Sequence, residues 1–83
     1  MTAPGYAPPQ KRSILILGHQ TSISLEPIFW TALEDEARRR GCSLNALVAA
    51  IDSERLSARP MPNLTSALRQ WLLAQRSGDG RSE

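Results

Sequence analysis

Few side chains of this sequence are of the types that carry out catalysis or bind metals, and they are not grouped. His19 is the single histidine and Cys42 the single cysteine, so these ligands alone cannot build a four-ligand zinc site, and no disulfide can form within the chain. The acids Glu34, Asp35 and Glu36 are consecutive, so on a helix they fan around the axis and do not converge on a metal. We therefore expect no enzyme activity, no metal and no cofactor.

One segment does place polar side chains in a chemically useful order. From residue 20 to residue 25 polar and apolar positions alternate, as on a strand with one buried face, and the polar face carries Gln20, Ser22 and Ser24. If two such strands pair antiparallel, the ribbon fits the ~12 Å major groove of B-DNA, where glutamine can pair with adenine and serine with either base type. The same face also suits the wet side of a half-exposed sheet, and the pattern leaves both interpretations open.

Size limits how this chain can fold. It has 83 residues, 41% of them apolar, and a formal net charge of +2. A domain this small buries only about 60% of the surface that its unfolded chain exposes. Without a disulfide or a metal, oligomerisation is the remaining source of stability, so we expect a homodimer. The charge of +2 is too small to indicate a nucleic-acid partner by itself.

The sequence contains no signal for a membrane or for export. No apolar stretch approaches the ~18–20 residues of a transmembrane helix, and the first ten residues do not have the order of a signal peptide. A single cysteine suits a reducing compartment. We expect a cytoplasmic protein without a membrane partner.

Proline and glycine divide the chain into one domain with two tails. We expect residues 1–12 to be a disordered arm, residues 77–83 a disordered tail and residues 13–76 the folded domain. The short apolar run Ile14–Leu17 predicts a first strand. Gly18-His19 permits a hairpin to the alternating strand; one long strand kinked at Gly18 is the alternative.

Three helices follow in the predicted order. The first spans residues 27–40, with a proline in its first turn, three arginines in its last turn and Gly41 after it. The second runs from a Ser43 cap to about residue 54, and the third, after an Asn63 cap, covers about residues 64–76. The sequence is therefore mostly α with a short N-terminal β-ribbon.

The segment TSISLEPIFWTALEDEARRRGCSLNALVAAI resembles the ribbon-helix-helix family of dimeric bacterial DNA-binding proteins, the Arc/MetJ type. The resemblance covers about residues 12–73 and is closest to a branch of short bacterial proteins with a later NLTSALR segment. The residues that carry it are Gln20–Leu25, Pro27, Phe29 with Leu33, Gly41 and Ser43-Leu44-Asn45. It implies an intertwined ribbon-helix-helix homodimer with an added C-terminal helix, acting as a transcriptional regulator on double-stranded DNA.

The resemblance also implies roles for individual residues. Base reading falls to Gln20, Ser22 and Ser24. Phosphate contacts fall to the start of the second helix, whose backbone N–H groups favour anions, at Ser43, Leu44 and Asn45. Lys11 and Arg12 of the arm are further candidates for phosphate contacts. The dimer core is expected to contain seven apolar side chains: Ile23, Leu25, Phe29, Leu33, Leu47, Val48 and Ile51.

Three departures from the family pattern bear on DNA binding. The reading strand carries no arginine or lysine, Glu26 precedes the proline and places a carboxylate near the DNA face, and the strand Ile14–Leu17 is additional. Because phosphate neutralisation supplies most non-specific affinity, we expect DNA binding that is weak or dependent on a partner.

The alternative is a protein-interaction module of the antitoxin type. In that case the fold is retained, but the working surface is the third helix or the tails, within residues 63–83. Trp71 lies on the apolar stripe of that helix, where a tryptophan serves either the core or a partner surface.

Overall fold

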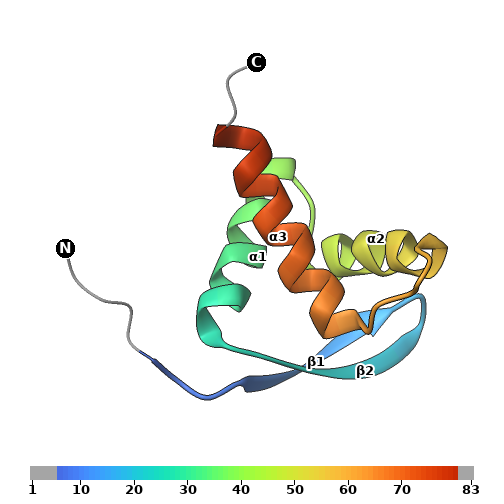
Figure 1. The fold of residues 1–83 in the computed structure, drawn as a ribbon. Helices are drawn as coiled ribbons and strands as arrows, with labels where there is room; N and C mark the ends of the chain where they lie inside the picture. The colour runs from blue at the N-terminus through green and yellow to red at the C-terminus, as the bar shows by residue number, and fades with distance from the viewer. Residues whose placement is uncertain (1–5, 81–83) are drawn as a thin grey trace.

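The computed structural model describes residues 6–80 and contains a β-hairpin followed by three helices. The elements are β1 (Gln10–Ile16), β2 (His19–Leu25), α1 (Pro27–Arg40), α2 (Leu44–Ser57) and α3 (Leu64–Gly80). All three helices lie on one side of the hairpin (Figure 1). This confirms the predicted class, a mostly helical fold with a short N-terminal β-ribbon and an added C-terminal helix.

The hairpin resolves the choice between two strands and one kinked strand. β1 and β2 pair antiparallel from Gln10 opposite Leu25 to Ile16 opposite His19. The two turn residues have positive φ, +49° at Leu17 and +84° at Gly18, as a type I′ turn requires. The additional strand therefore folds back on the alternating strand of its own chain.

Both boundaries of the expected folded domain need correction. β1 begins at Gln10, so the last three residues of the expected arm belong to a strand, and α3 continues to Gly80 through part of the expected tail. The prediction of an arm over residues 1–12 rests on its prolines, its glycine and the absence of apolar periodicity, and residues 10–12 are all polar, so their types do not mark them as a strand. Residues 1–5 of the arm and 81–83 of the tail lie outside the described residues.

The predicted helix ends are present. Gly41 takes a left-handed conformation (φ +70°), and the backbone N–H of Cys42 donates to the Ala37 carbonyl at 2.9 Å, which closes the end of α1. Ser43 Oγ accepts from the Ala46 N–H at 3.0 Å and caps α2. Asn63 Oδ1 accepts from the Ser66 N–H at 2.8 Å and caps α3 in the same way.

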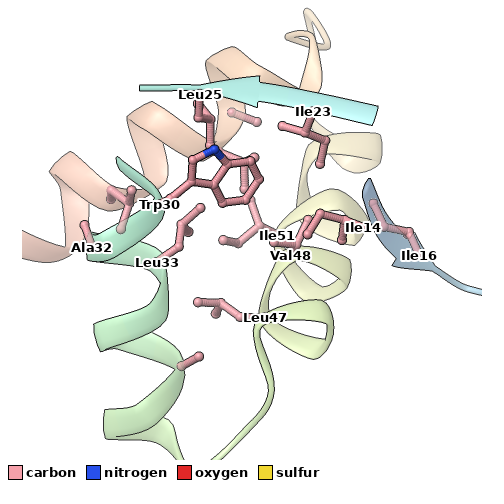
Figure 2. Packing of buried hydrophobic residues seen from close by; sticks show 14 residues of the cluster. Ile14, Ile16, Ile23, Leu25, Trp30, Ala32, Leu33, Leu47, Val48 and Ile51 are labelled. Atoms are coloured by element: carbon pink, nitrogen blue, oxygen red, sulfur yellow. The ribbon is translucent and has the colours of Figure 1, made fainter. Parts of the chain in front are cut away.

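The hydrophobic core lies between the hairpin and the helices of one chain (Figure 2). Its largest fully buried side chains are Trp30, Leu25, Leu33, Leu68 and Val48. Six of the seven residues expected in a dimer core are buried inside the single chain, and Phe29 is half-buried. Ile14 and Ile16 of β1 and Leu68 and Leu72 of α3 complete this core, so burial of these residues does not require a second chain.

Leu17 is expected to destabilise the turn, because a leucine in the left-handed region costs about 1–2 kcal/mol and asparagine adopts that region more readily. Its side chain is 81% exposed, so little packing is lost on replacement. Leu17→Asn should raise the unfolding free energy by about 1 kcal/mol and the Tm by roughly 4–8 °C. Thermal unfolding followed by circular dichroism measures this shift.

The control for Leu17→Asn is Leu15→Asn, which makes the same replacement in the extended part of β1. Asparagine is disfavoured in strands, so this control should lower the Tm or leave it unchanged. An equal fall in Tm for both variants would show that the leucine conformation in the turn carries no strain.

Candidate nucleic-acid interface

The face of the hairpin that points away from the helices carries mostly polar side chains. Because residues directly opposite each other in an antiparallel pair share a face, the register sets Lys11 beside Ser24, Ser13 beside Ser22 and Leu15 beside Gln20. All six side chains are exposed. The structure therefore brings the three residues expected to read bases onto one solvent-exposed strip, which we call the outer face: Lys11, Ser13, Leu15, Gln20, Ser22 and Ser24.

Two features of the outer face come from β1 and are not apparent from the alternating strand alone. Ser13 Oγ donates a hydrogen bond to Gln20 Oε1 across the hairpin. This bond fixes which way the amide points while leaving its two N–H donors and one acceptor position available. Lys11 adds an ammonium beside Ser24, so the outer face has a cation although the reading strand has none.

Arg12 lies on the other face of the hairpin. Its Nη1 donates to Glu34 Oε2 at 2.9 Å, and its guanidinium lies 4.9 Å from the centroid of the Trp30 ring. Strand alternation puts neighbours on opposite faces, so Lys11 and Arg12, both expected to contact phosphate, lie on different sides of the hairpin. A strand assignment for residues 10–12 would have predicted this separation from the sequence.

Arginine stacked on an aromatic ring and paired with a carboxylate occurs twice more. Arg40 lies 4.9 Å from the Trp71 ring centroid and donates to Glu36. Arg69 lies 5.5 Å from the Phe29 ring centroid and donates to both carboxylate oxygens of Glu26, at 2.9 and 3.3 Å. These two arginines cover the rings of Trp71 and Phe29 at the border of the core, and neither lies on the outer face.

Glu26 is the carboxylate expected near the DNA face. The hydrogen bond from Arg69, supported by the backbone N–H of Glu26 itself, holds the pKa of the Glu26 carboxyl below its ordinary value. Glu26 is thus ionised near neutral pH, and Arg69 compensates its charge. This ion pair lessens the repulsion that the sequence predicts between Glu26 and a phosphate backbone.

The start of α2 lies in the helical layer and not on the outer face. Ser43 and Asn45 are exposed and Leu44 is half-buried. The Ser43 cap binds the Ala46 N–H, while the N–H groups of Leu44 and Asn45 belong to the first helical turn and have no partner within the helix. They have the geometry of an anion site, separate from the polar strip of the hairpin.

The described residues offer neither a metal site nor a membrane span. No cluster of three or more histidine, cysteine or acidic side chains able to hold a metal ion occurs among them. No described helix is both long enough and apolar enough to cross a membrane.

Comparison with known proteins identifies the class. A ribbon-helix-helix domain model matches residues 9–76, and the chain belongs to the ribbon-helix-helix family, whose members in general are dimeric DNA-binding transcription regulators and not enzymes. One solved structure, an uncharacterized protein from Bordetella pertussis Tohama I, is 34% identical with a TM-score of 0.73 over 89% of this chain. This chain spans 62% of the length of that one. No curated protein matches.

Proposed function

We propose that this protein is a homodimeric, sequence-specific DNA-binding regulator of transcription that reads the major groove with the outer face of its hairpin. The observation that carries the proposal is the exposed strip of Gln20, Ser22 and Ser24 on a ribbon, in a chain of the ribbon-helix-helix family. The protein would act in the bacterial cytoplasm, where its DNA target lies.

The alternation of backbone hydrogen bonds supports a particular dimer. A two-residue turn makes Ile16 and His19 a hydrogen-bonded pair, so Ser13 and Ser22, three pairs further along, form a non-hydrogen-bonded pair. The backbone N–H and C=O of Ser22 therefore point away from β1. In the described part of the chain β2 pairs only with β1, which leaves this second edge open to another strand.

Pairing of the open β2 edges of two chains gives a four-stranded sheet, in which the expected two-stranded ribbon is flanked on each side by an additional strand. The two β2 strands lie at its centre and present both sets of reading residues. The two β1 strands flank them, about 4.8 Å further out, and carry Lys11 toward the phosphates. The N-terminus of α2, at Ser43, Leu44 and Asn45, is the second proposed phosphate contact.

The proposal predicts that Gln20→Ala together with Ser22→Ala removes sequence discrimination. A well-placed pair of base contacts is worth about 1–3 kcal/mol, so the preference for a selected target over random DNA should fall roughly tenfold or more. The target is first selected from genomic fragments at low salt, and binding is then measured by fluorescence anisotropy over a salt series.

The matched control is Thr31→Ala with Ser53→Ala, which also removes two exposed polar side chains, from α1 and α2. It should bind target and random DNA as the unaltered protein does. Failure of the unaltered protein to bind any genomic fragment at low salt contradicts the proposed function. Unchanged discrimination by the Gln20/Ser22 variant contradicts the assignment of base reading to these residues.

A further inference from the structure

An apolar groove of about 490 Å³ runs between α1 and α3, within the helical layer. Its lining from α1 includes Ile28, Phe29 and Ala32, and its lining from α3 includes Leu72 and Leu73. Ile28 is 61% exposed and Leu73 is 67% exposed, unusually high values for large aliphatic side chains beside one another. The DNA-binding proposal does not use this surface.

Two arginine side chains of α3 border the groove. Arg69, Leu72, Leu73 and Arg76 are spaced i, i+3, i+4 and i+7, so they share one face of the helix. Two arginines thus flank two leucines, with their backbones about 10 Å apart along the helix. This arrangement combines an apolar floor with a guanidinium at each end, that of Arg69 being already paired with Glu26.

Each of the two arginines has capacity for an acidic partner. Arg69 is held beside the groove by Glu26 and the Phe29 ring, and the bonds to Glu26 use only its Nη2, leaving other donors of the guanidinium. Arg76 is exposed and makes no ion pair among the described residues. The groove therefore favours an occupant with carboxylates at a spacing of two helical turns.

We infer that the groove binds an amphipathic helix of another protein, with apolar side chains on one face and acidic side chains seven residues apart beside them. Helix binding in a groove reads anchors at this periodicity. A second copy of this chain is a poor occupant, because it brings the same arginines to the rim. Among the described side chains, its acids other than Glu54 are already ion-paired.

The test uses the full chain and two synthetic, fluorescein-labelled helical peptides of 16 residues. Both peptides carry a leucine stripe; one has glutamates at two positions seven apart beside it, and the other has lysines there. By fluorescence anisotropy the glutamate peptide should bind with a micromolar Kd, at least tenfold more tightly than the lysine peptide. Leu73→Ser should weaken binding of both peptides.

Arg76→Glu separates charge recognition from apolar adhesion, because it should remove or reverse the preference for the glutamate peptide. Arg59→Glu makes the same charge change in the exposed loop before α3 and should leave the preference unchanged. Equal binding of the two peptides, or no binding of either, overturns the proposal.

Sedimentation velocity distinguishes a partner helix from a second copy. Leu73→Ser and Arg76→Glu should leave the oligomeric state of the chain unchanged. If either variant dissociates it, a second copy occupies the groove and the proposal is wrong. The peptide readout does not involve DNA, so failure of the DNA-binding proposal and failure of this one are distinguishable.

Discussion

Ser22→Pro is expected to dissociate the proposed dimer while leaving each chain folded. Proline has no backbone N–H and is tolerated in a strand only where that group is not needed within the sheet. The backbone of Ser22 points away from β1, so the hairpin loses no hydrogen bond, whereas a partner strand on the open edge of β2 loses one at each of two symmetry-related positions. The dissociation constant should rise at least roughly 100-fold, or about 2.8 kcal/mol.

The matched variant is Ser13→Pro, directly across the hairpin. Its backbone points to the open edge of β1, so the same chemical change blocks the opposite side of the sheet. Ser13→Pro should preserve the dimer in sedimentation velocity and Ser22→Pro should not, with circular dichroism showing that both variants are folded. DNA binding should follow the dimer and be lost with Ser22→Pro.

The pair of variants has clear contrary outcomes. Dissociation by Ser13→Pro alone assigns the interface to β1, and no dissociation by either variant excludes the strand edges. A charged substitution at Ile23 does not provide such a test, although the expected shared ribbon suggests it. Ile23 is only 3% exposed within its own chain, so a buried aspartate unfolds that chain whether or not it dimerises.

Local chemistry makes much of this fold predictable. Pro27, Gly41, Ser43 and Asn63 mark helix ends through backbone geometry and capping hydrogen bonds, which depend on neighbours in sequence, and the structure has all four helix ends there. The strict alternation after Gln20 likewise predicts which side chains of β2 are buried. Signals of this kind need no knowledge of distant contacts.

The features that sequence reasoning misses depend on contacts between distant segments. Residues 10–12 form a strand because β2 pairs with them, and composition alone assigns them to the arm. Arg12 lies on the inner face of the hairpin, away from Lys11, where Glu34 and Trp30 hold its guanidinium. The expectation that a homodimer is needed for stability comes from the short length of the chain. Length alone does not show that β1 and α3 supply further core residues within the same chain.

Trp30 shows how much of that core depends on one side chain outside the expected set. It is fully buried between β2 and the helices (Figure 2), and its Nε1–H donates to the Gln10 carbonyl at 2.9 Å. The Arg12 guanidinium covers its ring. Trp30 thus joins the helical layer to the beginning of β1, which no capping or periodicity signal connects to it.

Trp30→Ala is therefore expected to cost about 3–5 kcal/mol of unfolding free energy. A domain of about 80 residues has roughly 4–12 kcal/mol in total, so the variant should lose at least about a quarter of its unfolding free energy. Urea denaturation followed by far-ultraviolet circular dichroism measures the loss.

Trp71→Ala is the matched control, because it removes the same side chain from a half-buried position on α3 where Arg40 covers the ring. Its cost should be about 1–2 kcal/mol, since less apolar surface returns to water. Equal losses of unfolding free energy in the two variants would mean that the contacts of Trp30 with β1 contribute no additional stability. A larger cost at Trp30, joined by faster proteolysis near residue 10, would show that this indole holds β1 against the helices and so keeps Lys11 and Ser13 on the outer face.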